Sequence, residues 1–177
     1  MERHATTKVL GMMMMTKRTF LASAAAAIGG LALGGCSRQP ATGSETFEVV
    51  KTPDEWRAIL TPAQFKVLRE EGTERAGSSP LNAEKRTGAY VCAGCQLPVY
   101  ASATKFESGT GWPSFTAPID NAVRTRSDRG LLGTRTEVHC RRCGGHLGHV
   151  FKDGPPPTDQ RWCMNGVAMK FLPDGEA

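Results

Sequence analysis

Two pairs of cysteines constrain the fold of this chain more than any other feature. Cys92 and Cys95 enclose Ala-Gly, Cys140 and Cys143 enclose Arg-Arg, and 44 residues separate the two pairs. Each C-x-x-C hairpin lets two thiolates face one metal ion with little strain, and two such hairpins complete a tetrahedral zinc site. Four sulfur ligands leave no open position on the metal. The zinc is therefore expected to stabilise the fold rather than to take part in chemistry.

The same cysteines fit two other interpretations. Two disulfides would suit an exported protein, and a C-x-x-C pair is also the motif of thiol–disulfide oxidoreductases. Neither pair has the strand-to-helix context that a thioredoxin-like site needs, which favours zinc. His139, directly before Cys140, is an alternative ligand, although we expect it to be an exposed strand residue. A zinc ribbon alone would make the chain a binding module.

Residues 1–36 have the pattern of an export leader. Lys17 and Arg18 precede an apolar run of fourteen residues at 20–33, which is too short for a membrane anchor but suits a signal peptide. The run ends in Leu-Gly-Gly-Cys, which resembles the lipobox of bacterial lipoproteins, and "TKRTFL" resembles a variant twin-arginine signal. We therefore expect an exported, periplasmic lipoprotein anchored to the membrane through an acylated Cys36. The alternative is a buried Ala-rich helix.

Most of the basic charge lies in that leader. The whole chain has a formal net charge of +5, and residues 1–36 contain four Lys or Arg against one Glu. The remaining 18 basic and 16 acidic side chains leave a net charge of only +2. No stripe of basic and aromatic residues is visible, so no nucleic-acid partner is expected.

The remainder is expected to contain a polar tether at 37–51 and one domain at 52–177. Thr52-Pro53-Asp54-Glu55 and Thr61-Pro62-Ala63-Gln64 each combine an N-cap Thr, a Pro in the first turn and a Glu or Gln three residues after the cap. These signals predict two short helices, of which the second ends at Gly72.

From residue 87 onward the apolar pattern is typical of strands. Twenty glycines and eleven prolines indicate many turns, and we expect a mainly β, antiparallel domain preceded by the short helical segment. The expected strands cover residues 88–92, 97–102, 122–126, 136–140, 146–151 and 161–171.

Cys163, in "RWCMN", has no evident structural partner. If this stretch is a strand, Cys163 and Asn165 share one face. A reactive thiol needs a group that lowers its pKa or donates a proton. His146 and His149 in "GGHLGHVF" are the nearest such candidates, and Arg161 supplies a nearby cation. The alternative is a buried cysteine that packs as a small hydrophobic residue.

A family resemblance is visible in five stretches: "LTPAQFKVLREEGTER", "YVCAGC", "FESGTGWPSF", "TEVHCRRCGGHLGHVFKDGPPPT" and "RWCMNGVAMKF". Together they resemble the B-type methionine sulfoxide reductases, over about residues 54–172. The resemblance implies a β-tent-like domain of two antiparallel sheets with a structural zinc. It also implies an enzyme that reduces the R epimer of methionine sulfoxide in oxidised proteins, with a thioredoxin-like or other thiol reductant. We expect a monomer.

The resemblance assigns catalytic roles to five residues. Cys163 occupies the position of the nucleophile and would pass through a sulfenic acid. His146 and His149 match the pair that binds and protonates the sulfoxide oxygen. Their spacing does not place them on one strand face, so His146 is expected at a bend that enters the strand. Asn165 and Arg161 match the pair that orients the substrate and the nucleophile.

The resemblance also covers the pocket and the metal. Trp112 matches the aromatic wall that receives the methyl group of the substrate. The zinc ligands correspond to Cys92, Cys95, Cys140 and Cys143. The sequence departs from the family at two places. Thr110 stands where many members have a resolving cysteine, so an external thiol is expected to reduce Cys163. Ala76-Gly77 replaces a Pro-Phe, from which a more open pocket rim is expected.

Overall fold

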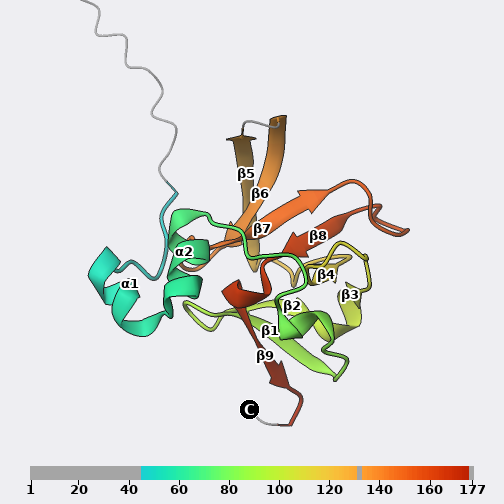
Figure 1. Cartoon of the computed structure of the whole chain (residues 1–177), viewed down its shortest axis with the longest axis horizontal. Coiled ribbons are helices and arrows are strands. Elements are labelled where there is room, and N and C mark those ends of the chain that lie inside the picture. The colour runs from blue at the N-terminus through green and yellow to red at the C-terminus, as the bar shows by residue number, and fades with distance from the viewer. Residues whose placement is uncertain (1–44, 131–132, 176–177) are drawn as a thin grey trace, which may run out of the picture. The chain divides into compact units, whose positions relative to one another are not determined.

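The computed structural model describes residues 45–130 and 133–175, all of which fall within one compact unit at 43–177 (Figure 1). The expected leader at 1–36, including Cys36, lies outside the described residues. Among the residues that the structure describes, no helix combines the length and the apolar character needed to cross a bilayer.

Two short helices open the described part of the chain, as the capping signals predict. α1 (Pro53–Ile59) and α2 (Pro62–Glu70) each begin with a complete capping box, in which the N-cap Thr and the Glu or Gln three residues later bond each other's backbone. α2 ends in a left-handed residue, Glu71. Gly72 follows, where a Cβ would lie 2.9 Å from the carbonyl oxygen of Lys66. Both helices and the end of the second are therefore confirmed.

The rest of the domain consists of two antiparallel sheets, which confirms the expected fold class. The smaller sheet has the order β2-β1-β9, and the larger has the order β3-β4-β8-β7-β6-β5. Their bounds are β1 (Gly88–Cys92), β2 (Pro98–Ala101), β3 (Lys105–Phe106), β4 (Ser114–Phe115), β5 (Val123–Gly130), β6 (Gly133–Cys140), β7 (His146–Phe151), β8 (Arg161–Met164) and β9 (Met169–Pro173). Short 3₁₀ turns are η1 (Pro80–Asn82), η2 (Ser102–Thr104) and η3 (Gly166–Ala168).

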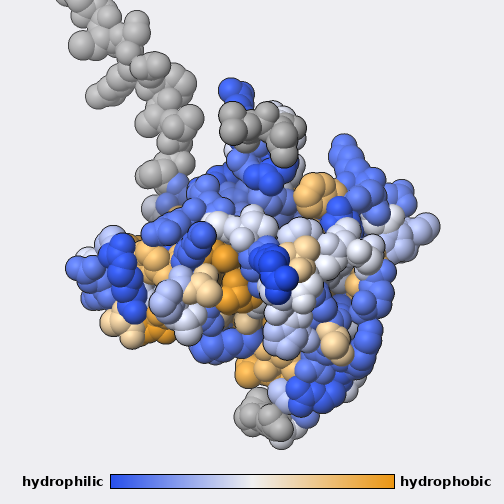
Figure 2. All heavy atoms as spheres, in the orientation of Figure 1, coloured by the Kyte–Doolittle hydropathy of each residue, from blue (hydrophilic) through white to orange (hydrophobic). Residues whose placement is uncertain are grey.

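Aromatic side chains fill the core beside the strand that carries Cys163. Tyr100 stacks on Phe115 at 4.3 Å between ring centroids, and Tyr90 contacts Phe115 edge-on at 4.9 Å. The Tyr100 hydroxyl donates to the sulfur of Met164, the residue after Cys163, at 3.1 Å. All these core residues are fully buried, so β8 is held firmly against the core. Figure 2 shows a mostly hydrophilic outer face with hydrophobic atoms gathered around the helices.

The prediction of one continuous strand over residues 161–171 is wrong. The chain leaves the larger sheet after β8, turns through η3 and enters the smaller sheet as β9. The cause is hydrogen bonding to residues far away in the sequence. The backbone N–H groups of Gly166 and Val167 donate to the carboxylate of Glu74, and the backbone N–H of Asn165 donates to Leu147. Because the N–H groups of Gly166 and Val167 are bonded to Glu74, they are not available for pairing with a neighbouring strand.

Residues 45–49, in the expected tether, contact the sheet side of the domain. The backbone N–H of Val49 donates to the carbonyl of Arg142 at 3.0 Å. Phe47 packs edge-on against His139, whose Nε2 lies 2.8 Å from a carboxylate oxygen of Glu45. His139 is therefore fully buried. The expectation that it is an exposed strand residue is wrong, because the preceding segment covers it.

Candidate active site and metal centre

Four cysteines meet where the two sheets come together. Their Sγ atoms all lie within 4.8 Å of one another. The Sγ atoms of Cys92 and Cys143 are 3.7 Å apart, and those of Cys95 and Cys140 are 3.5 Å apart. A tetrahedral zinc with bonds of about 2.3 Å to sulfur places neighbouring sulfurs about 3.8 Å apart, so the donor set fits zinc. His139 is not part of this group.

The position of this group indicates what a bound metal would hold together. Cys92 ends β1 of the smaller sheet, and Cys140 ends β6 of the larger sheet. Cys92, Cys140 and Cys143 are buried, and none of the described cysteines forms a disulfide. Arg69 of α2 donates to the carbonyl of Cys143 at 3.1 Å. A metal at this point would cross-link both sheets.

A second site surrounds Cys163, the half-buried residue in the middle of β8. In the antiparallel pairing Cys163 lies opposite Ser114 of β4 on one side and opposite His149 of β7 on the other. A cavity of about 120 Å³ opens beside it. Its lining residues are Thr73, Trp112, Arg135, Gly148, His149, Phe151, Cys163 and Asn165. Four of the residues expected from the sequence thus share one small pocket.

His149 is the histidine in direct contact with this pocket. Its Nε2 lies 2.8 Å from a carboxylate oxygen of Asp128, which Arg135 also contacts at 2.6 Å. Burial lowers the pKa of His149 and outweighs the opposing effect of the Asp128 hydrogen bond. The hydrogen bond from His149 lowers the pKa of Asp128. His149 is therefore neutral near pH 7, next to an ionised carboxylate.

His146 lies behind His149 and is not among the residues that line the pocket. It is buried, its ring centroid is 5.3 Å from that of His149, and its Nδ1 is 2.8 Å from a carboxylate oxygen of Glu137. The pairing of β6 with β7 shifts register between Val138 and His139, directly across from His146. This bulge is the expected bend at the start of the strand.

Arg161 supports Cys163 from the start of the same strand. Its guanidinium forms two hydrogen bonds with Asp153, at 3.0 and 2.9 Å, and stacks over Phe151 at 4.5 Å. Burial raises the pKa of the Cys163 thiol, and the charge of Arg161 opposes this effect. Arg161 itself is not among the lining residues of the pocket. Its charge and a hydrogen bond to the thiol both lower the pKa of Cys163, although burial prevails.

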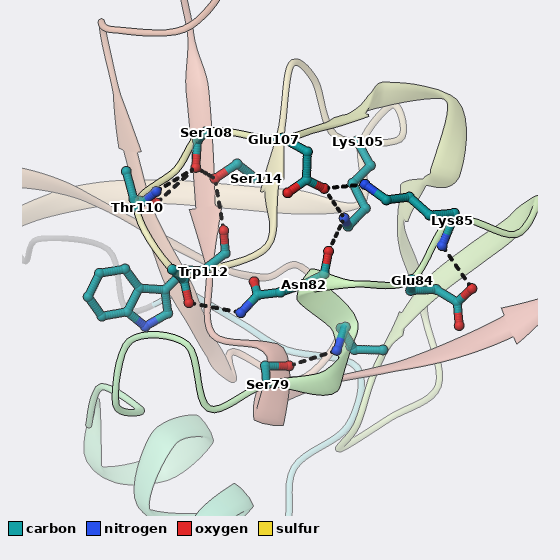
Figure 3. Close-up of polar contacts among 12 residues, drawn as sticks. Ser79, Asn82, Glu84, Lys85, Lys105, Glu107, Ser108, Thr110, Trp112 and Ser114 are labelled. Atoms are coloured by element: carbon teal, nitrogen blue, oxygen red, sulfur yellow. Dashed lines mark hydrogen bonds and ion pairs between the residues drawn. The ribbon is translucent and has the colours of Figure 1, made fainter.

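A chain of three hydroxyl groups, shown in Figure 3, includes a residue of β4, the strand that pairs with the Cys163 strand. The Ser108 hydroxyl lies 2.9 Å from that of Thr110 and 2.7 Å from that of Ser114, which is the residue opposite Cys163. A hydrogen bond from Thr110 lowers the pKa of Cys163, although burial still prevails. Thr110 therefore neighbours the thiol, at the position that the resemblance gives to a resolving cysteine.

Trp112 is held by the loop that follows α2. Its indole N–H donates to the carbonyl oxygen of Glu74 at 3.2 Å. The preceding Gly111 has φ +90° and accepts a hydrogen bond from the backbone of Gly77 at 2.7 Å. A Cβ at Gly111 would lie 3.0 Å from Ala76. Ala76-Gly77, where the sequence departs from the family, thus packs directly beside the Trp112 loop.

Comparison with known proteins gives one consistent result. The SelR domain family matches residues 60–173. Peptide methionine sulfoxide reductase MsrB of Pseudomonas putida (strain W619) is 51% identical, covering 71% of this chain and 96% of that protein. The MsrB of Methanosarcina barkeri is 50% identical, covering 72% and 91%. Peptide methionine sulfoxide reductase B2, chloroplastic, of Arabidopsis thaliana is 49% identical, covering 76% and 67%. The chain therefore belongs to the MsrB family of peptide methionine sulfoxide reductases.

Proposed function

We propose that this protein reduces the R epimer of methionine sulfoxide in oxidised proteins to methionine, with Cys163 as the nucleophile. The observation that carries the proposal is the meeting of Cys163, His149, Trp112 and Asn165 around one small pocket. A thiol, an imidazole and an aromatic wall are the groups that attack on sulfur, proton transfer to oxygen and binding of a methyl group require.

The proposed step begins with a proton transfer from Cys163 to His149. A neutral imidazole beside a thiol of raised pKa suits the role of base. Nε2 of His149 is bonded to Asp128, so Nδ1 is the nitrogen assigned to this transfer. The thiolate then attacks the sulfoxide sulfur. The imidazolium returns the proton to the sulfoxide oxygen, and the resulting hydroxyl group transfers from the substrate sulfur to the sulfur of Cys163 while the new sulfur–sulfur bond breaks. The thioether of methionine is released, and Cys163 ends as a sulfenic acid.

Trp112 and Asn165 shape the pocket in which this step takes place. The indole provides an apolar and polarizable surface that suits the methylthio end of the substrate. The Asn165 amide donates to the carbonyl of Leu147 at 3.1 Å and accepts from the backbone of Glu74 at 2.9 Å. Because both ends of this amide are bonded to backbone, Asn165 is assigned to hold the pocket wall.

The sulfenic acid is proposed to be reduced by an external thiol. Thr110 cannot form a disulfide, and the four-cysteine group would be occupied by its metal. An acylated Cys36 would be a thioether and equally unreactive. The reductant is therefore proposed to be a thioredoxin-like protein or a small dithiol, which attacks the sulfur of Cys163 directly.

The four-cysteine group is proposed to hold a structural zinc. Zinc bound there would supply folding free energy rather than chemistry, because four thiolates close its coordination shell. The two sheets that it would join carry β8 and β9 on either side of η3. The metal would thereby support the segment that follows Cys163 without contacting the substrate.

The protein is also proposed to be an exported, periplasmic lipoprotein. The support for this proposal is the basic flank, the short apolar run and the Leu-Gly-Gly-Cys sequence of residues 1–36. Mass spectrometry of the mature N-terminus tests it, since a lipid-modified Cys36 at the first position is the expected result. An unmodified chain that retains residues 1–36 would refute it.

The proposed activity is tested with the separated epimers of a methionine sulfoxide peptide and dithiothreitol as reductant. The wild-type protein is expected to reduce the R epimer and to leave the S epimer unchanged. Cys163→Ser, which keeps a side chain of similar size, is expected to reduce neither epimer while retaining its melting temperature. Turnover by the Ser variant would assign the chemistry to another thiol. Inactive wild-type protein would favour a zinc-binding module.

A further inference from the structure

Thr73 lies between two cavities, and Glu74 and Arg75 continue along the wall of the larger one. Thr73 lines the Cys163 pocket and also a larger hollow of about 520 Å³, which is bordered by α2, the loop after it, and η3. Figure 2 shows hydrophobic atoms exposed in the region of α2. Thr73 thus connects the loop after α2 to the Cys163 pocket.

Glu74, next to Thr73, makes four hydrogen bonds, of which two reach pocket residues and two reach η3. Its carboxylate accepts from the backbone N–H groups of Gly166 at 2.6 Å and Val167 at 2.9 Å. Its own backbone N–H donates to Oδ1 of Asn165 at 2.9 Å. Its carbonyl oxygen accepts from the indole N–H of Trp112 at 3.2 Å. One residue thus bonds the aromatic wall, the amide wall and the turn beyond β8.

The two hydrogen bonds of the Glu74 carboxylate are of a strong type, and the backbone that donates them is closely packed. Bonds between an ionised carboxylate and backbone N–H groups are charge-assisted, and a single carboxylate here holds two consecutive N–H groups. Gly166 is buried, and a Cβ at this position would lie 1.9 Å from the Ser79 hydroxyl. The η3 backbone therefore packs directly against Ser79 of the loop after α2. Glu74 thus bonds both η3 and Asn165 directly before it.

We propose that Glu74 is a positioning residue for the reduction at Cys163, holding Asn165 and Trp112 in place around the pocket. This inference rests on the proposed function and deepens it. Glu74 is not among the lining residues of the Cys163 pocket, so it acts through the two residues that it bonds. Its loss weakens binding of the sulfoxide more than it changes the reactivity of the thiol.

The test compares Glu74→Gln with wild type on a peptide that contains R-methionine sulfoxide. Gln keeps the size of the side chain but replaces one acceptor oxygen with an NH₂ group, which then faces a backbone N–H. KM is expected to rise roughly tenfold or more, while kcat changes by less than about threefold. The alkylation rate of Cys163 with iodoacetamide is also expected to change by less than about threefold, because this small reagent does not need the pocket walls.

Glu84→Gln is the matched control. One carboxylate oxygen of Glu84 likewise accepts from two consecutive backbone N–H groups, those of Lys85 at 3.0 Å and Arg86 at 2.9 Å. It lies in a different loop and does not line the Cys163 pocket. Glu84→Gln is expected to leave KM unchanged. This result would show that a rise in KM comes from the bonds of Glu74 and not from the loss of any carboxylate–backbone bond.

A double-mutant cycle with Asn165→Ala separates positioning from simple loss of stability. If Glu74 acts through Asn165, the double variant loses less kcat/KM than the product of the two single losses. A purely structural role would reduce the folded fraction, and with it kcat, at unchanged KM. Unchanged KM, or multiplicative losses, would overturn the inference. If Glu74→Gln does not fold, Glu74→Asp, which keeps the charge but shortens the reach, takes its place with the same outcomes.

The experiment also distinguishes failure of the proposed function from failure of the role proposed for Glu74. Wild-type protein without turnover would overturn the proposed function and this inference together. Wild-type turnover combined with an unchanged KM of the Glu74 variant would overturn the inference alone.

Discussion

His149 and Cys163 lie directly opposite each other on the neighbouring antiparallel strands β7 and β8. Residues paired in this way have their side chains on the same face of the sheet. The nucleophile and its proposed base therefore sit on rigid backbone rather than on loops. Gly148 allows this close approach, because a Cβ at that position would lie 2.1 Å from the carbonyl oxygen of Cys163. The relative position of Cys163 and His149 therefore depends on the register of β7 with β8 more than on any single side-chain contact.

The first prediction concerns the apolar wall. Trp112→Ala should lower kcat/KM for R-methionine sulfoxide by about ten- to 200-fold, since loss of contact with a methyl-sized group costs about 1–3 kcal/mol. Trp112→Phe keeps an aromatic face but loses the indole bond to Glu74, so a smaller loss is expected. Steady-state kinetics on both epimers measure the effect. An alanine variant with wild-type kcat/KM would show that Trp112 only packs the loop.

The second prediction concerns the pKa of Cys163. Burial raises this pKa, whereas hydrogen bonding from Thr110 lowers it. Thr110→Val removes the hydroxyl at nearly constant volume, so the thiol should ionise at higher pH. The midpoint of the alkylation rate of Cys163 against pH should therefore move upward, while Thr110→Ser should restore it. A midpoint that stays in place in the Val variant would mean that Thr110 does not bond the thiol.

The third prediction concerns the metal. Cys95→Ala should lose the zinc and melt at a much lower temperature. Binding and folding are coupled at such sites, and a loss of several kcal/mol corresponds to on the order of 10 °C or more for a domain of this size. Elemental analysis and calorimetry give the two readouts. Cys163→Ser is the control and should keep both metal and stability. If metal-free wild-type protein melts at the same temperature as the zinc-loaded protein, the result would argue against a structural zinc.

The fourth prediction concerns recycling. Thr110 hydrogen-bonds the thiol of Cys163, and its hydroxyl also contacts that of Ser108 in the chain shown in Figure 3. Thr110→Cys should therefore let the first turnover end in a disulfide between residues 110 and 163. Peptide mapping after one turnover without reductant would detect this bond. If a free sulfenic acid persists in the variant, the side chains of residues 110 and 163 are too far apart to form a disulfide, and residue 110 is not a resolving position.

Local signals predict the helices, most strands and the two cysteine pairs, because each depends on neighbours in the sequence. Thr52 and Thr61 cap their helices as expected, and two C-x-x-C pairs specify their own geometry. The end of β8 was not predictable in this way. It depends on Glu74, whose partner Gly166 lies 92 residues away. The alternation of apolar and polar residues along a strand does not reveal a hydrogen-bond acceptor so far away in the sequence.

The carboxylates behind the histidines were missed for a related reason. Glu137 contacts His146 from the neighbouring strand β6, and Asp128 contacts His149 from β5, the next strand beyond it. Nothing in "TEVHC" marks Glu137 as different from a solvent-facing strand residue. The signal that would identify it is the register of β6 with β7, because Glu137 pairs directly with His149. The buried position of His139 likewise depends on Glu45 and Phe47, which lie outside the domain motifs.

The most direct test of the central claim is a single turnover of the reduced protein with R-methionine sulfoxide and no reductant. We predict about one methionine formed per protein molecule, together with a sulfenic acid on Cys163 that a dimedone-type reagent traps and mass mapping locates. The S epimer should give neither product. A disulfide from Cys163 to one of the C-x-x-C thiols, formed as fast as methionine, would contradict the account. Stoichiometric methionine from Cys163→Ser would contradict it as well.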